Sequence, residues 1–218
     1  MKKKGIIIFT IFIYFFSGQL FAEEANLLKL IQSRYRSILS FSGKFEQKSY
    51  NSDSEIAPRK AEGTVSYKRP GKMRWNYNIP EEQLIVTNGE TLWLFDSLLE
   101  NVTVQKLEKI ADGTALTFLL GLGDLNYDFE RRRVSKDFLG FKDNLVVELV
   151  PKKDTVNLAF IQLQVRTETY DLIKILLMDH QGNYRTISLD SMKYNLEIED
   201  KFFEFEITED MEVIEIGS

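Results

Sequence analysis

The first repeating pattern in the chain has a helical period. Apolar side chains recur every three or four residues between positions 25 and 40. They are Leu27, Leu28, Leu30, Ile31, Tyr35, Ile38 and Leu39. Lys29, Arg34 and Arg36 lie on the other side of this pattern. Such spacing puts the apolar side chains on one face, so it predicts an amphipathic helix over residues 25–40.

From Phe41 onward the pattern changes to a period of two, which is typical of β-strands. Alternating side chains run through three consecutive segments, residues 40–50, 63–69 and 72–78. Asn88 and Gly89 then stand between two apolar runs. Both residue types accept positive φ angles, so this dipeptide predicts a tight hairpin between two further strands.

Strand-like segments resume in the second half of the chain. They are residues 144–151, 158–167, 171–179, 184–195 and 201–207. Between the strand-like segments of the two halves, the sequence of residues 112–122 predicts a second helix. Asp112 or Thr114 could cap it. No linker or internal repeat interrupts the pattern. We therefore expect one antiparallel meander of about ten strands with a few helices, forming a curved sheet or a barrel.

Several predicted strands carry large apolar side chains on both faces. Examples are the runs from Leu84 to Val86, from Leu92 to Phe95 and from Ile173 to Met178. A sheet with one wet face would show clean alternation instead. Either helices or a second sheet cover both faces, or the sheet curves and its concave face holds an apolar ligand. Periodicity alone does not choose between these alternatives.

The first 22 residues have a different composition from the rest. Lys2, Lys3 and Lys4 precede an apolar run from Gly5 to Phe16, and Ala22 offers a cleavage site. A run of about a dozen apolar residues is shorter than the roughly 20 that span a bilayer. The segment therefore predicts a cleaved secretory signal peptide, with a retained membrane anchor as the alternative. Residues 23–218 would then form one exported domain.

Composition narrows the possible functions of that domain. Because the signal segment carries three lysines and no acidic residue, the mature chain would have a net charge of −8 rather than −5. Such a charge disfavours binding to nucleic acid or to an anionic membrane. The chain has no cysteine, so it has no disulfide, no thiol nucleophile and no cysteine-linked lipid anchor.

Catalytic patterns are weak throughout the sequence. His180 is the only histidine, and it lies in a predicted turn. A cysteine–histidine site is therefore excluded, and a zinc site or a serine triad would depend on this one residue. Adjacent acids such as Glu81 and Glu82 are typical of a solvated turn. We expect a protein that is not an enzyme and uses neither a metal nor a cofactor.

The order of several motifs resembles a known family. These motifs are SFSGKFEQK at residues 40–48, YKRPGKMRW at 67–75, PEEQLIVTNGETLWLFD at 80–96, LLG at 119–121 and FFEF at 202–205. They are similar to those of the periplasmic outer-membrane lipoprotein carrier proteins, the LolA family. The resemblance covers nearly all of the expected mature chain. It implies an open, strongly curved antiparallel half-barrel that a lid of short helices closes around an apolar cavity.

The resemblance also implies a function and partners. Members of the family are monomeric carriers, not enzymes, and use no cofactor. They take triacylated lipoproteins from the inner-membrane ATP-driven transporter LolCDE and deliver them to the outer-membrane receptor LolB. Three other functions remain open. They are a LolB-like receptor, which the lack of cysteine argues against; a periplasmic sensor, which would need a second domain; and a carrier of another lipid.

Site residues follow from the same resemblance. The arginine that matches Arg69 would hold the empty cavity shut by bonding backbone carbonyls of the lid. Tyr35, Leu120 and Gly121 would supply those carbonyls. Met73, Trp75, Ile85 and Leu119 match apolar residues of the cavity. Three features depart from the family pattern. The central helix lacks an opening proline, Met73 stands where some members have phenylalanine, and the tail is short enough that a C-terminal strand could be missing.

Overall fold

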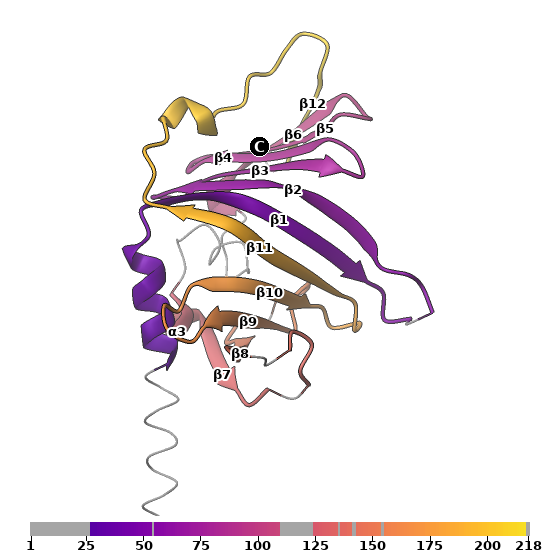
Figure 1. Ribbon diagram of the computed structural model, residues 1–218. Helices are drawn as coiled ribbons and strands as arrows, with labels where there is room; N and C mark the ends of the chain where they lie inside the picture. Colours follow the sequence, from indigo (N-terminus) through magenta and orange to yellow (C-terminus); the bar gives the residue numbers. More distant parts are fainter. Residues whose placement is uncertain are drawn as a thin grey trace, which may run out of the picture.

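The computed structural model describes residues 27–53, 55–109, 124–134, 136–140, 143–153 and 155–216 (Figure 1). Within these ranges, residues 27–37 form the N-terminal helix. This confirms the helix predicted from the apolar pattern, although it ends three residues earlier than we expected. Leu28, Ile31 and Tyr35 are buried on one face of the helix, and Lys29 is exposed.

The dominant feature is a single twelve-stranded sheet. Its strands are β1 (Ser40–Tyr50), β2 (Arg59–Lys68), β3 (Lys72–Ile79), β4 (Gln83–Asn88), β5 (Thr91–Asp96), β6 (Asn101–Lys106), β7 (Phe129–Arg132), β8 (Asn144–Pro151), β9 (Phe160–Arg166), β10 (Leu172–Met178), β11 (Tyr184–Tyr194) and β12 (Glu212–Ile216). In the described part of the chain, three short helical turns accompany it: η1 (Leu107–Lys109), α3 (Leu125–Asp128) and η2 (Asp200–Phe203).

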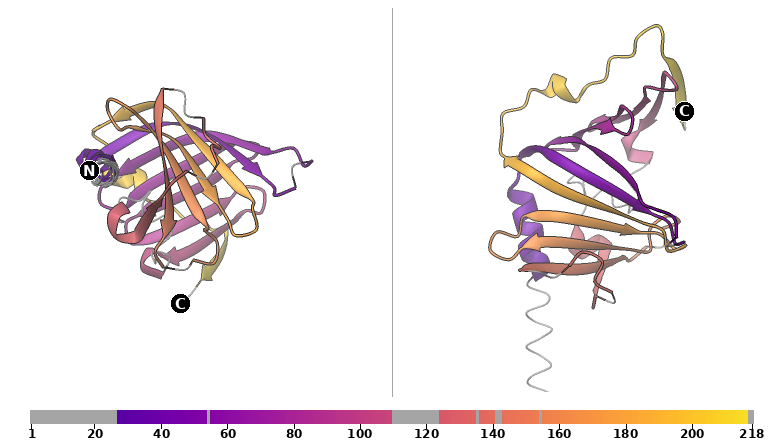
Figure 2. Two further views of the ribbon diagram at one scale, coloured as in Figure 1. Left: turned by 90° about the horizontal axis from the view of Figure 1, so that it is seen from below. Right: turned by 45° about the vertical axis from the view of Figure 1, so that its right-hand side comes forward.

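The strand order explains how the two halves of the chain meet. Across the sheet the order is β12-β6-β5-β4-β3-β2-β1-β11-β10-β9-β8-β7. Neighbours along β1 to β6 and along β7 to β11 are therefore consecutive in sequence, and the long antiparallel pair of β1 with β11 joins the two meanders. The sheet is open and strongly curled, as predicted (Figures 1 and 2). The N-terminal helix crosses the strand ends at the left of Figure 1.

The main core lies between the helix and the inner face of the sheet. Phe45, Val65 and Trp75 contribute from β1, β2 and β3, and Leu163 and Ile175 contribute from β9 and β10. Alternate residues of each strand point to this face, which is the pattern expected of a pleated sheet. The core thus joins both halves of the sheet to the helix.

The second half of the sheet is buried on its other face as well. Val146 on β8 and Leu176 on β10 pack there with Leu139, which comes from the segment that follows β7. Glu148 is fully buried on the same face of β8, where Arg132 and Gln162 bind its carboxylate. The chain between β7 and β8 therefore covers this face, which explains why these strands show no clean alternation.

The hairpin predicted at Asn88 and Gly89 is confirmed. Gly89 has a φ of +98°, and the Asn88 side chain accepts hydrogen bonds from the backbone N–H groups of Glu90 and Thr91. The glycine supplies the left-handed backbone that this turn requires, and the asparagine fixes its geometry.

Some predictions of local structure were wrong. Residues 201–207 do not form a strand, because Asp200–Phe203 is a 3-10 turn and the chain then runs without regular structure. The last strand is Glu212–Ile216, so the C-terminal strand is present, and it pairs with β6 in parallel. The sheet is therefore not wholly antiparallel, and it has twelve strands instead of about ten. The helix predicted over residues 112–122 lies outside the described residues.

Candidate functional site

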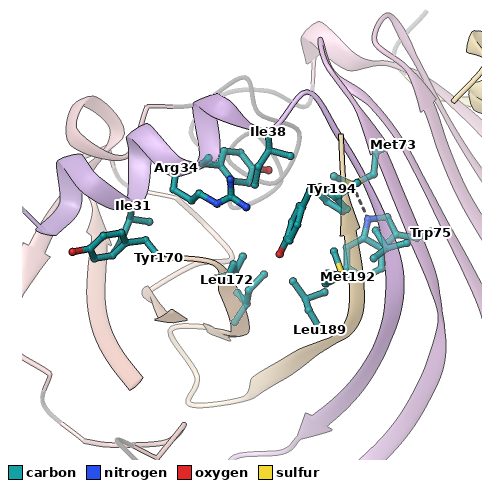
Figure 3. A pocket seen from close by; sticks show the side chains of 14 residues that line it. Ile31, Arg34, Ile38, Met73, Trp75, Tyr170, Leu172, Leu189, Met192 and Tyr194 are labelled. Atoms are coloured by element: carbon teal, nitrogen blue, oxygen red, sulfur yellow. Dashed lines mark hydrogen bonds between the residues drawn. The ribbon is translucent and has the colours of Figure 1, made fainter. Parts of the chain in front are cut away.

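An apolar pocket lies between the N-terminal helix and the inner face of the sheet (Figure 3). The helix contributes Ile31, Arg34, Tyr35 and Ile38. The first half of the sheet contributes Phe41, Val65, Met73 and Trp75. The second half contributes Tyr170, Leu172, Ile175, Leu189, Met192 and Tyr194. The enclosed cavity is small, about 40 Å³, so the helix and the sheet pack closely around it in this structure.

Two predicted cavity residues line this pocket from β3. Met73 and Trp75 are two positions apart, so both point to the inner face, and both are buried. The indole Nε1–H of Trp75 donates to the sulfur of Met73 at 2.7 Å (Figure 3). The ring of Phe45 packs edge-on against Trp75, with 4.6 Å between the ring centroids. This wall of the pocket is therefore closely packed and almost wholly apolar.

The other two predicted cavity residues do not line the pocket within the described structure. Ile85 on β4 is directly opposite Trp75 and packs against the main core, but it is not one of the residues that line the pocket. Leu119 lies outside the described residues.

Arg69 occupies the turn between β2 and β3, beside the C-terminal end of the N-terminal helix. Its Nη2 group donates to the carbonyl of Tyr35 at 3.2 Å, and its Nε group donates to the carbonyl of Ile38 at 3.5 Å. Its backbone N–H also donates to the carbonyl of Leu39 at 2.8 Å. Carbonyls at a helix C-terminus lack partners within the helix and carry partial negative charge, so a guanidinium stabilises them.

These contacts join Arg69 to Tyr35, one of the three residues predicted to supply a carbonyl. The other two, Leu120 and Gly121, lie outside the described residues. The side chain of Tyr35 is buried and stacks on Tyr67, with 6.4 Å between the ring centroids. Burial raises the pKa of the Tyr35 hydroxyl, with a smaller contribution from Tyr67, and the positive charge of Arg69 acts in the opposite direction. The role of Arg69 as a latch stays a prediction.

Further polar contacts tie the helix to the second half of the sheet. Arg34 forms an ion pair with Asp171, in the turn between β9 and β10, with 2.7 Å between Nε and Oδ1. Arg36 forms an ion pair with Asp124, which caps α3. The side chain of Gln32 accepts a hydrogen bond from the backbone N–H of Leu125 at 2.8 Å. The helix is thus fastened to both halves of the curled sheet.

Sequence reasoning missed these second-half residues. The partners of Arg34 and Arg36 lie 137 and 88 residues away in the chain, so no local pattern joins them. The apolar runs at 171–179 and 184–195 were recognised, but the sequence did not indicate which of their side chains face a pocket. Their alternation now places Leu189 and Ile175 on its wall.

Other candidate chemistry is sparse in the described part of the chain. His180 is exposed in the turn between β10 and β11, where its Nε2 atom lies 2.9 Å from the carbonyl oxygen of Thr155. Among the described residues, no group of three or more histidine and acidic side chains could hold a metal ion. Nor does any described helix have the length and apolar character needed to cross a membrane.

Comparison with known proteins identifies a family and several proteins that this chain resembles. The family described as outer membrane lipoprotein carrier protein LolA matches residues 36–206. A protein of Legionella pneumophila (strain Corby) named outer-membrane lipoprotein carrier protein is 30% identical over 208 residues, which is 95% of this chain and 98% of that protein. A protein of the same name from Alkalilimnicola ehrlichii is 31% identical over 197 residues, with coverage of 90% and 87%.

The fold is also found among solved structures. An uncharacterised conserved protein from Thermus thermophilus superposes with a TM-score of 0.54 over 89% of this chain and 99% of that one. The two sequences are only 8% identical, so this likeness concerns the fold alone.

Proposed function

Because this chain belongs to the LolA family of outer-membrane lipoprotein carrier proteins, we propose that it carries lipoproteins across the periplasm. The observation that carries the proposal is the apolar pocket between the N-terminal helix and the curled sheet. The acyl chains of the cargo would occupy this pocket, and the rest of the lipoprotein would stay in solvent. The protein would act as a monomeric, non-enzymatic carrier after removal of residues 1–22.

The physical need for such a pocket follows from the cost of exposing acyl chains. Each methylene that leaves an apolar environment costs about 0.8 kcal/mol, so one long acyl chain costs on the order of 12 kcal/mol. A water-soluble carrier must replace the membrane with an apolar surface of its own. Met73 and Trp75 on one wall and Leu189 and Ile175 on the other offer such a surface.

We further propose that the N-terminal helix is a movable cover over this surface. Arg69 would hold it closed in the empty protein through the carbonyls of Tyr35 and Ile38. Hydrogen bonds from a charged donor contribute roughly 1.5–3 kcal/mol each. That is enough to favour a closed state and little enough for entering acyl chains to overcome.

Two partners complete the proposal. An inner-membrane ATP-driven transporter of the LolCDE type would load the carrier, and an outer-membrane receptor of the LolB type would unload it. Since the carrier has no energy source of its own, transfer to the receptor must run toward higher affinity. Its acidic surface would help to steer it toward basic partners at low salt.

A release assay tests the proposal. Inner-membrane vesicles containing the transporter and a triacylated lipoprotein are incubated with ATP and the mature protein, and soluble material is separated by centrifugation. We expect the lipoprotein in the supernatant as a one-to-one complex with the carrier. Lipoprotein that stays with the vesicles would contradict the proposal. Mass spectrometry of material that co-purifies from the periplasm would show whether another lipid is the natural cargo.

A further inference from the structure

Arg34 is the one charged side chain among the described residues that line the pocket. It projects from the N-terminal helix toward the ring of Tyr194 on β11, as Figure 3 shows. The guanidinium carbon lies 5.0 Å from the centre of that ring. The side chain is 28% exposed, so it stands where the pocket meets solvent. A cation in this position is unusual for a site whose other lining residues are aliphatic, thioether or aromatic.

The environment of Arg34 holds the guanidinium in one orientation. Its Nε–H donates to Asp171 Oδ1 at 2.7 Å, and Nη1 donates to the hydroxyl of Ser37 at 3.3 Å. Asp171 is itself fixed, because its Oδ2 accepts a hydrogen bond from the Thr169 hydroxyl at 2.7 Å. Nη2 has no hydrogen-bond partner among the described residues. A guanidinium carries five N–H donors in a planar fork, so donors remain for a ligand.

The charge balance indicates which kind of ligand these donors suit. Asp171 neutralises Arg34, so the pair presents N–H donors without a net positive charge. The negative charge of Asp171 would repel a free carboxylate or a phosphate that approached the guanidinium. A neutral carbonyl oxygen needs only a donor, and the apolar surroundings strengthen its hydrogen bond.

We propose that Arg34 binds the ester carbonyl at the glycerol end of the acyl chains and so sets their depth in the pocket. The inference rests on the proposed carrier function and adds a chemical preference to it. The apolar wall would accept any long chain. Arg34 would favour a chain whose ester lies at the pocket mouth over a chain of the same length without that carbonyl.

Two matched probes test the preference. One is a tripalmitoyl-S-glyceryl-cysteine peptide, and the other is the same peptide with ether links in place of its two glycerol esters. Affinities of both are measured by competition with a fluorescent lipid. We expect the parent protein to bind the ester probe about tenfold or more tightly than the ether probe, as expected for hydrogen bonds from a charged donor.

Variants of Arg34 and its neighbours test whether this side chain causes the preference for the ester probe. Arg34→Met keeps the apolar stem and should bind both probes with the affinity that the parent shows for the ether probe. Because Arg34→Met leaves Asp171 unpaired, Arg34→Met/Asp171→Asn guards against a folding defect and should behave in the same way. Arg36→Met is the matched control, since Arg36 comes from the same helix but does not line the pocket. It should keep the ester preference.

The possible outcomes separate this inference from the carrier function. Equal affinity of the parent for the two probes would overturn the role of Arg34 and leave the carrier function standing. The role of Arg34 is also overturned if the double variant keeps the preference, or if it loses affinity for both probes to the same extent. A parent protein that binds neither probe would overturn the carrier function itself.

Discussion

Arg69 and Tyr35 lie 34 residues apart in the chain, and the guanidinium of Arg69 donates to the Tyr35 carbonyl at 3.2 Å. One residue belongs to the turn between β2 and β3, and the other to the last turn of the N-terminal helix. The bond therefore joins the sheet to the element that covers the pocket. Any movement that lifts the helix from this side has to break it.

The first prediction removes this bond. In Arg69→Leu the donors are lost, so the closed state is destabilised and acyl chains no longer have to break it before binding. We expect the variant to accept lipoprotein from the transporter, to hold it more tightly than the parent, and to accumulate as a loaded complex. A transfer assay to receptor-containing membranes measures the outcome.

Two further variants control this experiment. Arg69→Lys keeps the charge but loses the planar fork, so we expect partial transfer. Arg59→Leu removes an exposed arginine from the other end of β2 and should transfer like the parent, within about 0.5 kcal/mol in apparent affinity. Normal transfer by Arg69→Leu would show that Arg69 is not a latch.

The second prediction uses the two tryptophans as reporters. Trp75 lines the pocket, whereas Trp93 on β5 does not. Acyl chains that enter the pocket replace solvent and neighbouring side chains around the Trp75 ring. We therefore expect the emission spectrum to change on loading in the parent and in Trp93→Phe, and to change little in Trp75→Phe. If Trp93→Phe abolishes the spectral change and Trp75→Phe keeps it, the cargo binds elsewhere.

The third prediction concerns acid and the C-terminal segment. The carboxylate of Asp200 at the start of η2 bonds the ammonium groups of Lys68 and Lys72 at 2.6 and 2.7 Å. Hydrogen bonds from these lysines lower the pKa of Asp200 from 3.8 to about 2. Because the folded state lowers this pKa, the stabilisation is present above pH 3.8 and is lost as the pH falls through about 2.

Carbon NMR of the Asp200 carboxyl and hydrogen exchange across η2 would measure this effect. We expect the carboxyl to titrate near pH 2 and the exchange of η2 to accelerate over the same range. Asp200→Asn lacks the titrating group, so its exchange should show no such step. A carboxyl that titrates near its ordinary value of 3.8 would mean that the two lysines do not hold it in solution.

The fourth prediction concerns close packing between β1, β2 and β3. A Cβ atom at Gly63 would lie 2.0 Å from the backbone oxygen of Asn76 and 2.9 Å from the ring of Phe45. The backbone of a paired strand cannot move away from the added methyl group without disturbing the sheet. We therefore expect Gly63→Ala to lower the free energy of unfolding by about 1–3 kcal/mol. Thr64→Ala, at the next and exposed position, should change it by less than about 0.5 kcal/mol. Denaturant unfolding measures both, and equal effects would contradict the packing argument.

Local patterns predicted the elements whose burial is regular. The N-terminal helix, the first three strands and the hairpin at Gly89 each follow one simple period or one turn signal. The wrong predictions concern segments in which the alternation of side chains does not follow their burial. Residues 201–207 alternate like a strand, but the chain turns at Asp200–Phe203, where Phe203 is fully buried. The last strand is exposed along its whole length, so its pairing with β6 depends on the edge of a distant strand.

The pocket could be predicted only on one side. Met73 and Trp75 share a strand with a clear alternation, and the family resemblance assigns them to the cavity. Arg34 looked like a residue of the solvated helix face, because its partner Asp171 is distant in sequence. The register between β10 and β11 decides which apolar residues face inward, and no single stretch of sequence encodes that register.

The position of β1 in the sheet has a consequence for the order in which the protein assembles. Strand β1 is complete at residue 50, but its neighbour β11 is complete only at residue 194. Residues 59–106 can form their meander early, because each strand pairs with the next along the chain. The pocket needs both halves, so it cannot form until nearly the whole polypeptide is available. If the chain is exported with its N-terminus first, as the proposed function requires, it would have no site for acyl chains until export is almost complete.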